Sequence, residues 1–226
     1  MGKSTVINLD YLDPVLILGP ERYDPRRHKT DGISNISNVA RIVQEQIYPD
    51  KGRNHVRYLV FDTSDAHEGI IMTSKTPIHI KDVGSAKKII EPGDVIISRL
   101  RPYLRQVAYV DDKLTASWPD EVVLACSTEF FVLRSRDTRS IAFLAPYLLS
   151  SSVQEILSAS QEGGHHPRFN KKTLETLSLP ENLLSHRDDI SSLFETAVRS
   201  MREADLTMRG LISNCAETAN KVDMSA

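Results

Sequence analysis

Residues 93–105 have the sequence Gly93-Asp94-Val95-Ile96-Ile97-Ser98-Arg99-Leu100-Arg101-Pro102-Tyr103-Leu104-Arg105. The overlapping Glu91-Pro92-Gly93-Asp94 predicts a turn, because proline presets φ and glycine accepts a positive φ. Val95 to Leu100 is a β-branched, apolar run of strand length. Pro102 lacks a backbone N–H and is expected to end this strand.

The two faces of this strand differ in character, because side chains alternate along it. One face carries Ile96, Ser98 and Leu100, and the other carries Val95, Ile97, Arg99 and Arg101. The second face begins apolar and ends cationic, so the strand is expected to leave the core and carry two arginines to a rim. With Tyr103 and Arg105 following, this rim suits a polyanion, since arginine forks bind phosphates and guanine edges. An edge strand with solvated arginines is the alternative.

The run GDVIISRLRPYLRQVAYV resembles the central segment of the target recognition domain in type I restriction-modification specificity subunits. Other parts of the chain follow the family's order, from about Arg22 to Cys215. These parts are Tyr58-Leu-Val-Phe-Asp, Gly69-Ile-Ile, Ser85-Ala-Lys, Phe130-Phe-Val-Leu-Arg134, Tyr147-Leu-Leu-Ser-Ser151, Gly163-Gly-His-His-Pro-Arg168 and Leu174 to Pro180. The resemblance implies a DNA-binding module.

Composition indicates an ordinary soluble globular protein: 226 residues, 40% hydrophobic, 26% charged, with a net charge of −2. This charge argues against an indiscriminate nucleic-acid coat protein, although a specific DNA-binding protein can gather its positive charge on one face. Cys126 and Cys215 lie far apart, and reduced thiols in the cytoplasm are expected. No run of about 18 apolar residues exists, so no membrane association is expected.

The order of apolar patterns predicts an α+β fold. Short strand-like runs from Arg57 to Leu133 predict a curled mixed or antiparallel sheet with short helices around it. The segment from Val39 to Ile47 fits a short helix capped by Asn38, or a strand. Ser140 to Leu157 has helical spacing interrupted by Pro146, which predicts a kink or two consecutive helices.

Further basic segments accompany the central strand. The loop with Arg22, Arg26, Arg27, His28 and Lys29 is either a solvated entry segment or a phosphate-contacting arm. The Gly163–Arg168 loop is either DNA-facing or a simple interhelical turn, and its adjacent histidines have no partner that suggests a metal site. The candidate DNA-binding residues are Arg99, Arg101, Tyr103, Arg105, His165, His166, Arg168, Lys171 and Lys172.

A long helix is predicted near the C-terminus, giving a recognition domain at 1–182, a helix at 183–215 and a polar tail at 216–226. Its apolar residues repeat at alternating spacings of four and three, which is a coiled-coil seam. They are Ile190, Phe194, Ala197, Met201, Ala204, Met208 and Leu211. The seam is expected to join a partner helix, most simply in an antiparallel homodimer; packing on its own domain is the alternative.

Catalytic signatures are absent from the sequence: it contains no GxxxxGK, GxGxxG, CxxC, HExxH or GxSxG motif. In agreement with this absence, the resemblance implies a non-catalytic, half-length specificity subunit that needs no cofactor of its own. It implies double-stranded DNA, an N6-adenine DNA methyltransferase subunit carrying S-adenosylmethionine and an ATP-dependent restriction subunit as partners, with a bipartite DNA site. A protein–protein scaffold that uses the long helix, or an enzyme of unrecognised type, are the alternatives.

Overall fold

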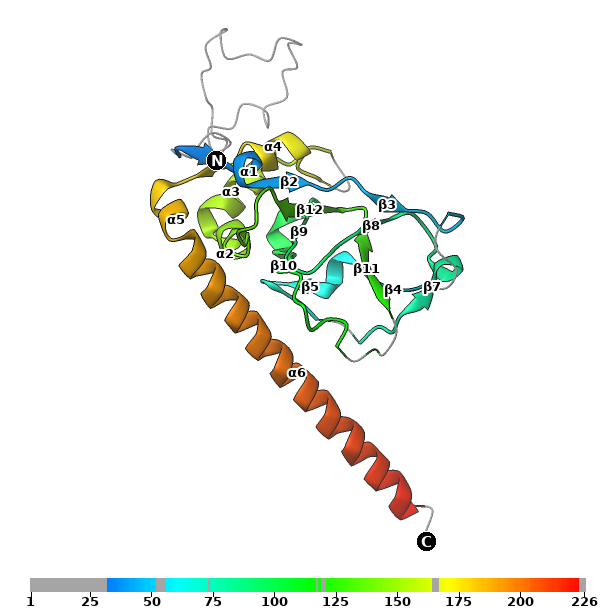
Figure 1. The fold of residues 1–226 in the computed structure, drawn as a ribbon. Helices are drawn as coiled ribbons and strands as arrows, with labels where there is room; N and C mark the ends of the chain where they lie inside the picture. Colours follow the sequence, from blue (N-terminus) through cyan, green and yellow to red (C-terminus); the bar gives the residue numbers. More distant parts are fainter. Residues whose placement is uncertain are drawn as a thin grey trace, which may run out of the picture.

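The computed structural model describes residues 32–51, 56–72, 74–116, 118, 121–163 and 167–223. Its compact part is α+β, and the long helix α6 (Arg187–Asp223) extends from it toward the C-terminus (Figure 1). The basic loop at Arg22–Lys29 and the candidate residues His165 and His166 lie outside the described residues.

Two larger sheets form the centre of the compact part. The four-stranded sheet has the order β10-β9-β12-β2 and is antiparallel throughout. Its strands are β2 (Ala40–Ile42), β9 (Val95–Ser98), β10 (Val107–Tyr109) and β12 (Phe130–Ser135). The five-stranded sheet has the order β3-β8-β11-β4-β7 and is mixed, because β11 runs parallel to β4. Its strands are β3 (Gln46–Ile47), β4 (Arg57–Phe61), β7 (Ile78–His79), β8 (Lys87–Ile89) and β11 (Val122–Ser127).

Shorter elements surround these sheets. Two small antiparallel pairs join β1 (Ser34–Asn35) to β13 (Ser178–Leu179) and β5 (Ala66–His67) to β6 (Ile70–Ile71). The short helices are α1 (Ile36–Val39), α2 (Leu144–Leu149), α3 (Ser151–Ala159), α4 (Lys171–Glu175) and α5 (Glu181–Ser185). The 3-10 turns are η4 (Thr63–Asp65), η5 (Ile80–Asp82) and η6 (Pro102–Leu104). The predicted α+β class with a mixed, largely antiparallel sheet is confirmed.

Strand β9 is buried on both faces. Val95 and Ile97 pack with the helical layer formed by α2 and α3, whereas Ile96 packs between the two sheets. It pairs with β10 on one side and β12 on the other. The alternative of an edge strand is therefore wrong, and the apolar run of the sequence reflects burial on both faces.

The predicted turn before β9 is confirmed. Gly93 has a φ of +95°, and the Asp94 N–H donates to the Glu91 carbonyl at 3.0 Å. The Asp94 carboxylate is buried and accepts two hydrogen bonds of 2.8 Å from Arg134 in β12. A forked ion pair therefore fixes the turn to the neighbouring strand.

Three expected boundaries are corrected by the structure. The segment after α1 forms the strands β2 and β3, so the strand alternative holds and the helix does not. The Asn38 side chain lies at the start of α1, where it accepts from the Asn35 N–H at 3.2 Å. Strand β9 ends at Ser98, since Leu100 makes only an isolated bridge to Arg168. Pro146 lies in the first turn of α2, where its missing N–H has no intrahelical acceptor, so the break between the two expected helices falls at Ser150 instead.

Helix α6 packs against its own domain over its first half. Its inward face carries Arg187, Ser191, Val198 and Arg202, all less than 5% exposed. The Arg202 guanidinium donates to Asp111 at 2.9 Å and to the Ile71 carbonyl, and that of Arg187 donates to the Ser140 carbonyl at 2.9 Å. The helix is thereby held to the sheets at two points along its length.

This packing corrects the expected seam. Ile190 and Phe194 pack against the domain's own core, so they do not begin a free seam. The other five members lie on an exposed flank, with Met201, Met208 and Leu211 each more than half exposed. The helix also continues to Asp223, so residues 216–223 are helical and do not form the expected tail.

Gly69 provides a test of how α6 is docked. Its φ is +115°, and a Cβ atom there would lie 2.8 Å from the Phe194 ring. We expect Gly69→Ala to lower the free energy of unfolding by about 1–3 kcal/mol, because it strains the backbone and displaces the helix. Trp118, the only tryptophan in the sequence, lines a hollow beside Arg202 and Leu206 of α6. Displacement of α6 in Gly69→Ala would expose the indole to water, so the fluorescence emission of this variant should shift to the red.

The matched control is Gly84→Ala, because a Cβ there meets nothing within 4 Å and the φ of Gly84 is not positive. Urea unfolding and tryptophan emission of both variants are the measurements. Identical behaviour of the two variants would contradict the packing of Phe194 against Gly69.

Candidate nucleic-acid interface

The chain makes a tight, strained turn where β9 ends. Arg101 and Arg105 both adopt left-handed backbone conformations, with φ of 46° and 53°, which costs a non-glycine residue about 1 kcal/mol or more. Between them, η6 is closed by hydrogen bonds from Leu104 N to Arg101 O at 2.9 Å and from Arg105 N to Pro102 O at 2.8 Å. Pro102 is buried beneath the turn, while Tyr103 and Leu104 are 60% and 47% exposed.

A single carboxylate connects this turn to a distant loop. Glu129 accepts from Arg99 Nε at 2.9 Å and from both the Arg168 Nε, at 3.0 Å, and its terminal nitrogen, at 2.9 Å. The hydrogen bonds from Arg168, followed by those from Arg99, lower the pKa of Glu129 to about 2. We call this group of Arg99, Glu129 and Arg168 the Glu129 clamp.

Backbone hydrogen bonds complete the docking of the loop. The Arg101 N–H donates to the Pro167 carbonyl at 3.3 Å, and the Phe169 N–H donates to the Arg99 carbonyl at 3.2 Å. Phe169 is buried against Phe131, with ring centroids 5.6 Å apart. The structure thus brings together the central strand and the Arg168 segment, which the sequence marked separately as basic.

Lys171 and Lys172 extend the cationic surface from the same docked segment. They occupy the first turn of α4, whose start is capped by the Asn170 side chain accepting from Thr173 N at 2.9 Å. Both lysines are exposed, and Lys171 pairs with Glu175 at 3.2 Å. The cap fixes the start of α4 just after Arg168, which the Glu129 clamp holds. The clamp therefore positions these two lysines as well as Arg168.

The arginines of the rim differ in their partners. Arg105 pairs with Glu68 at 2.5 Å, and Arg99 and Arg168 share Glu129. Within the part of the chain that the structure describes, the Arg101 guanidinium has no acidic partner. Four arginines against two glutamates leave a local excess of positive charge, which suits a phosphate backbone.

The sequence patterns predicted the arginines of this surface but not the glutamates that pair with them. Arg99 and Arg101 were expected on one strand face; the left-handed backbone at Arg101 ends that alternation. Glu129 and Glu68 were not expected in the site. They lie 30 and 37 residues from their arginine partners, and no local pattern signals such a pairing.

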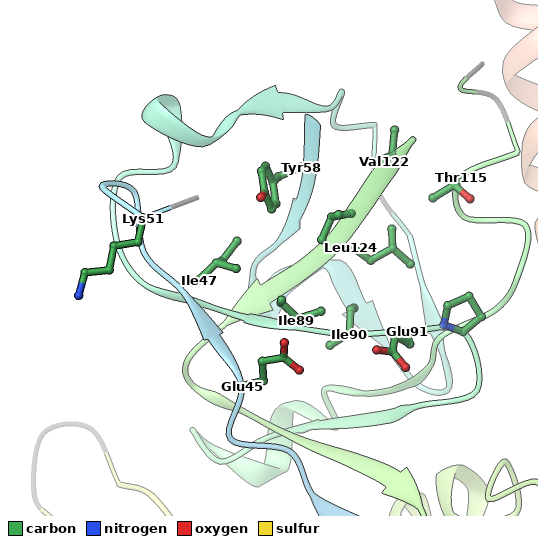
Figure 2. A pocket seen from close by; sticks show the side chains of 12 residues that line it. Glu45, Ile47, Lys51, Tyr58, Ile89, Ile90, Glu91, Thr115, Val122 and Leu124 are labelled. Atoms are coloured by element: carbon green, nitrogen blue, oxygen red, sulfur yellow. The ribbon is translucent and has the colours of Figure 1, made fainter. Parts of the chain in front are cut away.

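A separate cavity of about 450 Å³ lies on the five-stranded sheet (Figure 2). Its walls are mainly apolar, including Ile47, Tyr58 and Leu124, and the side chains of Glu45 and Glu91 lie on one side of it. The cavity shares no residue with the four arginines around the turn, Arg99, Arg101, Arg105 and Arg168, which we call the arginine group. Its charged lining residues are Glu45, Glu91 and Lys51, so it has no excess of positive charge to attract a phosphate.

The described residues offer neither a metal site nor a membrane-spanning segment. They contain no group of three or more histidine, cysteine or acidic side chains placed to hold a metal ion. None of their helices has the length and apolar character needed to cross a membrane. The arginine group therefore remains the strongest candidate site in this part of the chain.

Known structures resemble the fold of this chain, although no protein-family model and no curated protein matches it. A chain from the structural study of complex assembly and conformational transition of the type I R-M system matches with a TM-score of 0.54 and 24% identity. The match covers 80% of this chain and 44% of that one. The chain shares its fold with that part of a type I R-M system chain.

A second match is the HsdS subunit from Thermoanaerobacter tengcongensis, with a TM-score of 0.49 and 22% identity. It covers 79% of this chain and 46% of that subunit. This chain therefore spans less than half the length of either match. At the level of the fold, the expected resemblance to the type I R-M system is confirmed by the first match.

The Glu129 clamp makes a testable contribution to stability. Glu129→Gln removes the charge that holds two arginines, and we expect it to lower the free energy of unfolding at pH 7 by about 1–2 kcal/mol. Because the folded-state pKa of Glu129 is below its usual value of 4.5, the wild-type advantage should be complete above pH 4.5. It should be lost as the pH falls toward 2, where Glu129 itself becomes protonated.

Glu175→Gln is the control, since it removes an exposed pair within one helix and should change stability by less than about 0.5 kcal/mol. Chemical unfolding of the three proteins between pH 7 and pH 2.5 gives the comparison. A gap between wild type and Glu129→Gln that stays constant down to pH 2.5 would show that Glu129 is not an ionised clamp.

Proposed function

We propose that this chain is the sequence-specific DNA recognition subunit of a type I-like restriction-modification system. In this role it directs an N6-adenine DNA methyltransferase subunit, which carries S-adenosylmethionine, to a bipartite site on double-stranded DNA. The chain itself is non-catalytic, and an ATP-dependent restriction subunit is a further partner. The observation that carries the proposal is the arginine-rich end of β9, fixed to the Arg168 segment by Glu129 on a specificity-subunit fold.

The geometry of this surface suits duplex recognition. Arginines mounted on a buried strand end and a clamped loop are held in place before DNA arrives, so little side-chain ordering remains on binding. Of the four arginines around the turn, Arg101 is the one with no acidic partner among the described residues, and we assign it to a base edge. Arg105 forms an ion pair with Glu68, and we assign it to a phosphate.

Binding to duplex DNA should depend steeply on salt. Each phosphate contact contributes about −0.9 to the slope of log K against log salt concentration. We expect Arg105→Ala to make this slope shallower by about one contact. Arg57→Ala is the control, because Arg57 is an exposed arginine on β4, outside the proposed interface. Fluorescence anisotropy between 50 and 300 mM salt is the measurement. A flat response of the wild-type chain would favour the scaffold alternative.

Base recognition is tested separately from charge. The cognate sequence is first selected from a pool of random duplexes by the purified chain with its methyltransferase. Arg101→Ala should then cost about 1–3 kcal/mol on the cognate duplex and little on a scrambled one. Arg105→Ala should weaken both duplexes equally. Equal losses on both duplexes for Arg101→Ala would refute its assignment to a base.

The exposed flank of α6 supports a homodimer within the same proposal. Ala197, Met201, Ala204, Met208 and Leu211 lie on this flank, beside the face that packs on the domain. At 1.5 Å per residue it is about 20 Å long. An antiparallel pair of such flanks would place two recognition domains about a two-fold axis, which predicts a palindromic bipartite site.

Two aspartates on this flank test the dimer. Met201→Asp with Met208→Asp would bury charge at the contact, which is unfavourable without a partner. We expect the double variant to be monomeric in light scattering, with unchanged unfolding, since both methionines are more than half exposed in the single chain. Thr196→Asp with Thr207→Asp adds the same charge to another exposed face of α6 and should leave the dimer intact. A wild-type chain that is monomeric both alone and with the methyltransferase would refute the two-fold arrangement.

A further inference from the structure

The turn η6 exposes two apolar side chains side by side. On the part of the sheet domain that the structure describes, the large apolar side chains that stay exposed are Ile33, Tyr48, Tyr103 and Leu104. Only Tyr103 and Leu104 are neighbours, and they are 60% and 47% exposed at the tip of the turn. Apolar surface left in water at a tip has no role in the packing of this domain.

The turn that carries this pair is rigid. Left-handed residues bound it on both sides, at Arg101 and Arg105, and hydrogen bonds close it internally. Pro102 is buried below it, and η6 lies against α3. Non-glycine residues hold such conformations only where the surrounding structure determines them, and such sites often serve a ligand. The tip is therefore presented as a fixed projection.

The surroundings of the tip indicate what it contacts. Arg99, Arg101, Arg105 and Arg168 lie around the turn, with Glu129 and Glu68 as their acidic partners, so positive charge is in excess. An excess of positive charge around an apolar tip matches a polyanionic partner. On DNA, cations hold the phosphates on both sides of an apolar wedge, which is the arrangement found at this tip.

We propose that Tyr103 and Leu104 form a wedge that enters a base-pair step, with Leu104 opening the stack and the Tyr103 ring lying against an exposed base face. This inference rests on the proposed function and adds to it a mode of recognition. DNA would be recognised partly through how easily a step opens, since steps differ in their deformability. Flexible pyrimidine–purine steps are the preferred targets.

Fluorescent bases test the wedge directly. The duplex recovered in the selection is prepared with 2-aminopurine at each adenine in turn and pyrrolo-cytosine at each cytosine in turn, so that every base pair carries a reporter in one of the duplexes. Wild-type chain should raise the emission severalfold at one step, because both reporters brighten when unstacked. Leu104→Ala should abolish the rise and weaken binding about tenfold, within the range of one lost stacking contact.

The salt slope separates a wedge from a phosphate contact. Leu104→Ala and Tyr103→Ala should leave the slope unchanged, since neither removes a cation, and that result also shows that the arginine surface is intact. Leu104→Met should keep the emission rise, because it preserves an apolar side chain of similar size. Tyr48→Ala is the control, an exposed tyrosine on the loop after β3, and should behave as wild type.

Three outcomes would overturn the wedge alone. Tight binding by the wild-type chain with no emission rise at any base pair would refute it and leave the proposed function standing. So would a rise that persists in Leu104→Ala, or loss of methyltransferase association in Tyr103→Ala and Leu104→Ala with duplex binding unchanged. Absence of duplex binding by the wild-type chain would refute both proposals together.

Discussion

The carboxylate of Glu129 is the contact on which the candidate interface depends. It is shared by two arginines that lie 30 and 39 residues from it along the chain, and it thereby fixes the end of a buried strand to a loop from another part of the fold. Hydrogen bonds between ionised groups are stronger than neutral ones, and sharing one acid keeps most of the arginine charge available. The clamp therefore organises a cationic surface while neutralising only one of its charges.

A second rigid joint connects this surface to the long helix. Arg202 reaches Asp111 and the Ile71 carbonyl at one point, while Phe194 lies on Gly69 at another. Separating Arg202 from Asp111 would leave two buried charges without partners, so moving α6 away from the sheets at this point is unfavourable. The direction of α6 relative to the arginine group is therefore fixed within one chain. In a symmetric pair of chains, this fixed direction would set the distance between two DNA half-sites.

Sequence patterns predicted much of this fold for identifiable reasons. Val95 to Leu100 was predicted as a strand because its apolar run is β-branched and follows a turn with Gly93, and the structure forms β9 over Val95–Ser98 of this run. The helices around Pro146 were predicted from the spacing of apolar residues. The direction in which α6 faces was not predicted, because its buried face carries Arg187 and Arg202, which a hydrophobic pattern assigns to solvent. Ion pairs made across the fold supply that information, and they leave no periodic trace in the sequence.

Site-specific photo-crosslinking shows directly whether the end of β9 faces DNA. With p-benzoylphenylalanine in place of Tyr103, irradiation of the chain on its selected duplex at physiological salt should crosslink protein to DNA. The same group in place of Tyr48, on the loop after β3, should give no crosslink. Crosslinking from position 48, or from neither position while the duplex remains bound, would show that the end of β9 does not face the DNA.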